Sequence, residues 1–339
     1  MHRLRSYIIR SFSLLFFSIF LPLFAIASVI FLIKMAHVTS VIQLSVTELI
    51  KLYLFILPEL LFYTLPIAFF IAGVLSLYKL STDNEMVVFF ALGIKPGYLL
   101  RIFFLPALLF TLLLIFNFFF LFPHVKTLSN NFIDYKKSEA KFNLSASEFG
   151  HNFGDWLLYI GKEEKKGVYG DVVLFHKAKD EEIFISAKTA EINNNQGVLR
   201  LKLTEGEGDS YTADTLSQIT FETMYINDIL NADLDLYQNA LEYWMDPNKR
   251  QKKIRKFITH FLFSIFPLIS LYMILSIGIT HDRHQKGFVY LYLFVSLIVY
   301  FGSSGMLHSV MGFYAIPLII TVWLSTSYLF YRQKILARF

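Results

Sequence analysis

The sequence of 339 residues contains no cysteine and few charged residues. Without cysteine, disulfides, thiolate metal ligands and a cysteine nucleophile are excluded. Charged residues make up 17% and hydrophobic residues 55% of the chain, with a mean hydropathy of +0.52, which is too apolar for an ordinary soluble protein. A G-x-x-x-x-G-K-[ST] phosphate loop is also missing, so the sequence shows no nucleotide-binding motif of that type. The composition indicates a membrane protein.

Charge is distributed unevenly along the chain. Residues 124–247 contain 12 Lys+Arg and 21 Asp+Glu, whereas the rest of the chain contains 19 and 5. An acidic, polar segment between basic, apolar segments indicates an aqueous domain inserted into a membrane domain. This pattern argues against a nucleic-acid partner.

Long apolar tracts predict six membrane spans, because one crossing needs about 20 mainly apolar residues. The tracts are 12–33, 52–78, 102–122, 257–279 and 288–331, of which the last holds two spans with a turn between Gly302 and Gly312. We therefore expect spans one to three within 1–123 and spans four to six within 248–339. The first tract is too long for a signal-peptide core, although Ala25 and Ala27 resemble a cleavage site.

Basic residues beside the short loops predict the orientation. If the N-terminus is cytoplasmic, Lys34 and Lys51 flank the outer ends of the spans. The inner flanks then collect Arg3, Arg5, Arg10, Lys79, Lys95, Arg101, Arg283, Lys286, Arg332, Lys334 and Arg338. One cluster disagrees with this orientation, because Lys249, Arg250, Lys252, Lys253, Arg255 and Lys256 lie beside the fourth span on the outer side. Both termini are thus expected in the cytoplasm, with the polar insert outside.

The polar insert, which we expect over 124–247, alternates apolar and polar residues as β-strands do. The predicted strands are 157–160, 171–176, 182–192, 198–204, 209–214 and 218–226. Glycines between them predict turns, at Gly161, Gly167, Gly170, Gly197 and at Gly206 with Gly208. The predicted fold class is a membrane α-helical protein with six transmembrane helices and an inserted all-β domain. That domain is jellyroll-like, a sandwich or an open barrel.

A short helix is predicted at about 81–93, in the loop between spans two and three. Thr82 and Glu85 have the spacing of a capping box, Gly93 suits a helix C-terminus, and Pro96 ends the segment. Such a helix is too short to cross the membrane, so it lies on the surface or docks into a partner. Glu85 is then either a partner contact or only a helix cap.

Four features together carry a family resemblance: the segment 3–10 (RLRSYIIR), the Pro58–Glu59 pair, the Leu65–Pro66 pair and the loop 80–93. In this order they resemble the lipopolysaccharide-transport permeases LptF and LptG, also called the YjgP/YjgQ family. The Pro58–Glu59 pair favours LptF. The six-span plan with one β insert extends the resemblance over essentially the whole chain.

The resemblance implies a subunit of an ABC exporter in the inner membrane, with a periplasmic β-jellyroll-like domain. A homologous permease subunit and an LptB ATPase dimer are the implied partners, and lipopolysaccharide passes from the complex to LptC and LptA. The chain itself would be no enzyme and bind no cofactor, because the ATPase binds ATP and Mg. The short helix would be the coupling helix, with contacts to the ATPase from Asp83, Glu85, Met86, Phe89 and Gly93.

Basic residues on the outer side form a second candidate site. Lys34 matches a family position where lipid A phosphates are expected, and His37 stands where that pattern has an arginine. A basic cluster before span four suggests anionic headgroup binding, through Lys249, Arg250, Lys252, Lys253 and Arg255. The alternatives are a snorkelling anchor for Lys34 and a solvated helix start for the cluster.

Two other classes of function remain open at this point. A membrane-anchored sensor would need a cytoplasmic output domain, and the inner loops are short. A lipid-modifying enzyme would need converging polar groups within the spans, where the conspicuous residues are Glu59, Asn117, His260 and His308. We expect no metal site, because His281, Asp282 and His284 share one short turn without a fourth ligand.

Overall fold

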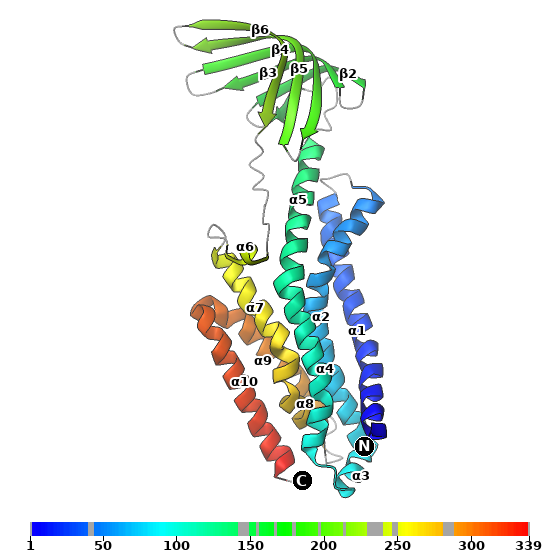
Figure 1. Cartoon of the computed structure of the whole chain (residues 1–339). Coiled ribbons are helices and arrows are strands. Elements are labelled where there is room, and N and C mark those ends of the chain that lie inside the picture. Colours follow the sequence, from blue (N-terminus) through cyan, green and yellow to red (C-terminus); the bar gives the residue numbers. More distant parts are fainter. Residues whose placement is uncertain are drawn as a thin grey trace. The chain divides into compact units, whose positions relative to one another are not determined.

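The computed structural model describes residues 2–39, 44–141, 149–153, 156–165, 168–177, 181–195, 198–212, 215–228, 240–245, 250–280 and 288–337. The contacts within the chain divide it into two compact units (Figure 1). The first unit contains Met1–His37, Val46–Ser129 and Leu236–Phe339, and is helical. The second contains Val38–Ser45 and Asn130–Asp235, and carries the β-sheet.

Five helical segments of the described chain are long and apolar enough to cross a membrane. Three of them are single helices, namely α1 (His2–Thr39), α2 (Val46–Thr82) and α9 (Phe288–Met311). The fourth is α4 (Pro96–Phe116), which continues through the π-helical turn η1 (Asn117–Leu121) into α5 (Phe122–Lys141). The fifth is α10 (Ala315–Tyr331), which follows the 3-10 turn η3 (Gly312–Tyr314) and ends in the π-helical turn η4 (Arg332–Leu336). A sixth is obtained if α7 (Arg250–Ile269) and α8 (Leu271–Gly278) count as one span. The predicted multi-pass helical architecture is therefore confirmed.

The fourth span differs from the sequence prediction, because it is broken rather than continuous. Helices α7 and α8 meet at Ser270 with a bend of 51°. Pro267 lies in the last turn of α7, where it removes one backbone donor. The indole nitrogen of Trp323 donates to the Ser270 hydroxyl at 3.0 Å, so a side chain of α10 holds the break.

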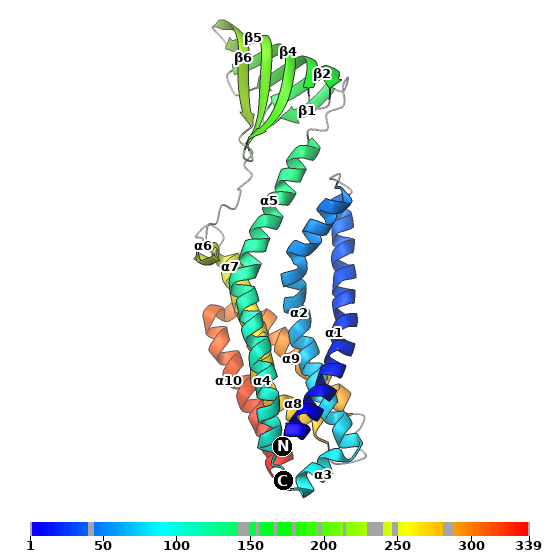
Figure 2. The same ribbon diagram turned by 45° about the vertical axis from the view of Figure 1, so that its right-hand side comes forward.

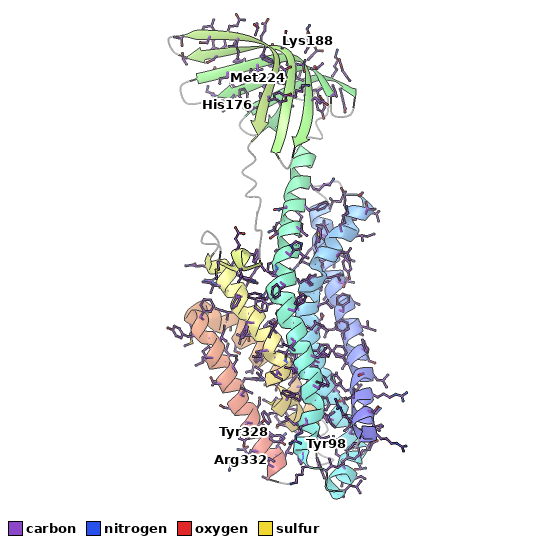
Figure 3. The ribbon with its side chains drawn as sticks, in the orientation of Figure 1. Tyr98, His176, Lys188, Met224, Tyr328 and Arg332 are labelled. Atoms are coloured by element: carbon purple, nitrogen blue, oxygen red, sulfur yellow. The ribbon has the colours of Figure 1, made fainter. Side chains whose placement is uncertain are left out.

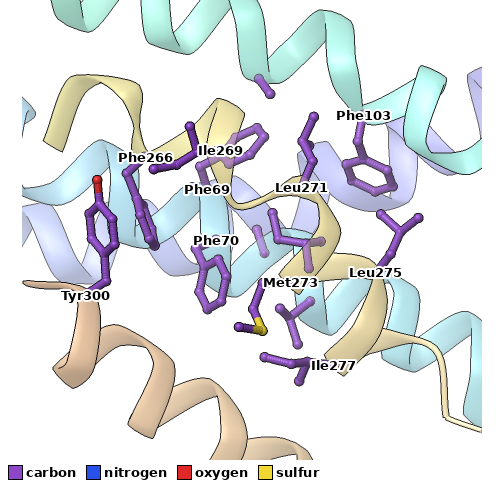
Figure 4. Close-up of a cluster of buried hydrophobic side chains, with 14 of the residues drawn as sticks. Phe69, Phe70, Phe103, Phe266, Ile269, Leu271, Met273, Leu275, Ile277 and Tyr300 are labelled. Carbon is purple, nitrogen blue, oxygen red and sulfur yellow. The ribbon is translucent and has the colours of Figure 1, made fainter. Parts of the chain in front are cut away.

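Aromatic side chains fill the core of the helical unit (Figure 4). The ring of Phe12 on α1 lies 5.4 Å from Phe69 and 5.5 Å from Phe103, in edge-on contacts. Near the break, Phe266 lies 4.4 Å from Tyr300, measured between ring centroids. The Tyr300 hydroxyl donates to the Leu262 carbonyl at 2.7 Å, which satisfies the one polar atom of this buried ring.

Helices α2 and α8 approach each other closely at Gly278. A Cβ atom at Gly278 would lie 2.7 Å from Cβ of Leu77 and 2.8 Å from the carbonyl oxygen of Val74. Ser81, one residue before the end of α2, donates to the Gly278 carbonyl at 3.3 Å and accepts from the Thr280 amide at 3.4 Å. The C-terminal ends of α2 and α8 are thereby joined.

The β unit is an antiparallel sheet of six strands in sequence order (Figure 2). The strands are β1 (Phe149–Phe153), β2 (Trp156–Lys165), β3 (Val168–Lys177), β4 (Glu181–Asn195), β5 (Val198–Thr212) and β6 (Leu216–Asp228). The all-β insert is confirmed, and its described strands form a meander. The sequence missed β1 and divided β5 into two strands.

Glycines in this sheet lie within strands where the sequence predicted turns, so those turns are wrong at Gly161, Gly170, Gly206 and Gly208. Gly206 is covered by the ring of Phe221, and a Cβ atom there would meet this ring and the Ser186 carbonyl oxygen. A glycine in a strand thus marks close packing instead of chain reversal.

The strand pairing is irregular at one position beside Gly206. Asp171 on β3 and Glu205 on β5 have left-handed φ angles of 54° and 50°, and the pairing of both strands with β4 skips Lys188. The alternation of buried residues therefore shifts by one, so that Ala187 and Ala190 are both buried. Lys188 (Figure 3) contacts Glu205 and holds the pKa of that carboxyl below its ordinary value, although both are exposed and the pair adds little stability.

We predict that Gly278→Ala lowers the stability of the helical unit by about 1–3 kcal/mol, because the new methyl group forces α2 and α8 apart. The midpoint of thermal unfolding of the purified protein measures this. Gly302→Ala is the control, since a Cβ atom there meets nothing within 4 Å and alanine favours a helix by about 0.5–1 kcal/mol. Equal midpoints for the two variants would contradict the close approach.

Candidate functional site

The short helix α3 (Glu85–Ala91) lies at one end of the helical unit. Helix α1 begins at this end and α10 finishes there in η4 (Figures 1 and 2). Tyr98 of α4 and Arg332 at the end of α10 belong to the same end (Figure 3). The loop that carries α3 therefore shares one face of the unit with both ends of the described chain.

Local backbone bonds define where α3 begins and ends. Asn84 precedes it with a left-handed φ of 61°. At the other end Gly93 has a φ of 77°, its amide bonds the Phe90 carbonyl, and the amide of Ile94 bonds the Phe89 carbonyl, each at 3.0 Å. This is a Schellman motif, so the predicted role of Gly93 at the helix end is confirmed.

The predicted capping box is wrong. Thr82 is the last residue of α2, and its hydroxyl donates to the Lys79 carbonyl at 2.9 Å instead of capping α3. The residue before α3 is Asn84, whose side chain makes no cap bond. The sequence spacing was misleading because α2 continues about one helical turn beyond the predicted span, to Thr82. Glu85 is consequently not a member of a capping box.

The Glu85 carboxylate has another contact. The hydroxyl of Tyr7, near the start of α1, donates to Oε1 of Glu85 at 2.8 Å. Asp83 is exposed beside it. Sequence analysis missed Tyr7, because 78 residues separate it from Glu85 and only the fold brings them together.

Helix α3 turns one side toward the core and the other outward. Met86 is 2% exposed and packs into the aromatic core, with Phe89 half-buried against it. Val87, Val88 and Leu92 are 48%, 54% and 75% exposed. An outward apolar surface with a carboxylate at its edge is suited to docking another protein.

The basic residues of the second candidate site have different surroundings. Lys34 on α1 and Arg255 on α7 are exposed. Lys253 is 6% exposed, and its ammonium lies 4.2 Å from the ring centroid of Tyr243 on α6 (Ala240–Met245). The side chains of His37, Arg250 and Lys252, and all of Lys249, lie outside the described residues.

Two of the other polar candidates, Asn117 and His260, make structural contacts in the part of the chain that the structure describes. Asn117 donates to the Pro58 carbonyl at 3.0 Å, which joins η1 to α2. His260 stacks on Phe62 at 4.5 Å and bonds the Lys256 carbonyl through Nδ1. Within the described ranges no three His, Asp or Glu side chains gather as metal ligands. The turn 281–287 and the side chain of His308 lie outside those ranges.

Comparison with known proteins identifies the chain. A search of curated proteins returned no match. The family model described as "Lipopolysaccharide export system permease LptF/LptG" matches residues 6–330. This range includes the described membrane-spanning helices and the β insert, apart from the first residues of α1, Tyr331 of α10 and η4. The chain therefore belongs to the LptF/LptG family of lipopolysaccharide export system permeases.

Proposed function

We propose that α3 is the coupling helix through which an LptB ATPase dimer drives this permease. The observation that supports this is the surface formed by Val87, Val88 and Leu92 with the Glu85 carboxylate at its edge. Asp83 adds a second carboxylate, while Met86, Phe89 and Gly93 fix the helix on the bundle. ATP and Mg belong to the ATPase, because the permease sequence has no phosphate loop.

The α3 end is proposed to face the cytoplasm. Basic residues gather there, on helix ends and short loops, namely Arg3, Arg5, Arg10, Lys79, Lys95, Arg101, Arg332 and Lys334. Such residues favour the cytoplasmic side of a membrane. Both termini are then cytoplasmic in the inner membrane, and the β insert over 124–247 is periplasmic. The membrane parts are 1–123 and 248–339.

The proposed specific partners follow from this orientation. The chain pairs with a homologous permease subunit, and its periplasmic β domain passes lipopolysaccharide to LptC and LptA. The Pro58–Glu59 pair within α2 supports assignment as LptF. Membership of a permease family replaces the sensor and enzyme alternatives.

The outer basic residues are proposed to bind the anionic headgroup. Lys34 and Arg255 support this best because their side chains are exposed. Lys253 is held by Tyr243, so its contribution is long-range attraction rather than direct contact. His37, Lys249, Arg250 and Lys252 complete the proposed set on sequence grounds.

Charge reversal tests the coupling role. The complex is solubilised gently from membranes and purified through a tag on this chain. Glu85→Lys should then reduce the recovered ATPase by about tenfold or more, because the new lysine repels the basic side chain of the ATPase that the glutamate would attract. Recovery of the second permease subunit should stay unchanged. Glu222→Lys, an exposed reversal on β6, is the matched control. Full ATPase recovery with Glu85→Lys would refute the coupling role.

The headgroup site has a separate test. Lys34→Glu and Arg255→Glu should each reduce the lipopolysaccharide that co-purifies with the complex by about fivefold, since a basic residue at a membrane surface contributes about 1 kcal/mol. Arg332→Glu, at the opposite end of the unit, should leave the amount unchanged. If all three variants retain equal lipid, these residues are only membrane anchors.

A further inference from the structure

The hydrogen bond between Tyr7 and Glu85 joins two helices that meet only through the fold. We infer that Tyr7 is a positioning residue, which holds the Glu85 carboxylate in the orientation that receives a basic side chain of the ATPase. This inference rests on the proposed function of α3 and extends it. It assigns a role to the N-terminal turn of α1, which lies outside α3 and its loop.

Buried neighbours in the chain hold the backbone of both residues that form this bond. Ile8, next to Tyr7, is fully buried, and Phe12 one turn later is 4% exposed and packs on Phe69 and Phe103. Met86, next to Glu85, is 2% exposed. The two backbones are therefore held by core packing, while Tyr7 itself remains 47% exposed. The hydroxyl and the carboxylate meet at 2.8 Å on the surface.

The bond leaves Glu85 able to bind a cation. The capping role is absent, so the carboxylate is not committed to the backbone of its own helix. Tyr7 uses Oε1, and no residue that the structure describes donates to Oε2. A carboxylate offers about four lone-pair positions, so a guanidinium or ammonium group can approach the free oxygen.

Tyrosine suits this task because its hydroxyl donates without adding charge. A basic residue in its place would neutralise Glu85 and compete with the incoming cation. A free glutamate side chain would sample several rotamers, and binding would have to fix them. A hydroxyl that already fixes the carboxylate removes that cost, which is the general benefit of preorganisation.

The test is a double-mutant cycle on the permease complex reconstituted in nanodiscs, with the dissociation constant of added ATPase as the readout. Tyr7→Phe removes only the hydroxyl and should weaken binding about three- to tenfold. Glu85→Asp keeps the charge but is one methylene too short to meet Tyr7, and should weaken binding by a similar factor. The double variant should bind as Glu85→Asp does, because the hydroxyl then has no carboxylate to hold.

Each outcome distinguishes the positioning role from its rivals. If Tyr7→Phe weakens binding equally in both backgrounds, Tyr7 only joins α1 to α3 and the inference is wrong. Unchanged affinity with Tyr7→Phe, where Glu85→Lys abolishes binding, removes the positioning role but keeps the coupling role. Unchanged affinity with Glu85→Lys removes the proposed function itself. Tyr314→Phe, at an exposed tyrosine of η3, should behave as wild type.

Discussion

The structure depends on satisfying backbone polar groups where no water is available, since an unpaired group in an apolar interior costs several kcal/mol. Continuous helices satisfy their own groups, so the demand falls on the irregular positions. At two of these, a side chain from another helix supplies the partner. Asn117 bonds the Pro58 carbonyl beside η1, whereas Ser270 at the break keeps its backbone bonds to Phe266 and Ile274, and Trp323 bonds its hydroxyl. Ser81 bonds both the carbonyl and the amide at the end of α8.

These bonds also determine which helices can move together. Ser81 and the close approach at Gly278 join the ends of α2 and α8, and α2 continues directly into the loop that carries α3. If α3 is the coupling helix that we propose, a push on it is delivered to α2 and α8 together, whereas the bend at Ser270 separates α8 from α7. Where rigid elements meet at a localised joint, a small movement at an interface can produce a larger movement elsewhere.

Local sequence patterns correctly predicted the structural features that depend on residues close to one another in the sequence. Apolar tracts gave the spanning helices, alternation gave most of the strands, and Gly93 gave the end of α3, because each depends on residues a few positions apart. The errors have one shared cause. The Thr82 cap failed because α2 extends past it, and Gly206 was read as a turn because the ring of Phe221, which covers it, lies on another strand. Tyr7 lies in the segment 3–10 that carries part of the family resemblance, but nothing in that segment points to Glu85, which is 78 residues away.

The surface of α3 combines two kinds of interaction that have different consequences for a docked partner. The exposed valines and Leu92 offer apolar area, which strengthens binding but tolerates sliding because it has no direction. The carboxylate of Glu85 is directional, so it selects one placement and penalises others. In the coupling role that we propose for α3, the second property matters more than the first, because a strong contact with no fixed position would not transmit a push. One oriented charge at the margin of a small apolar face therefore suits a mechanical joint better than a larger apolar face would.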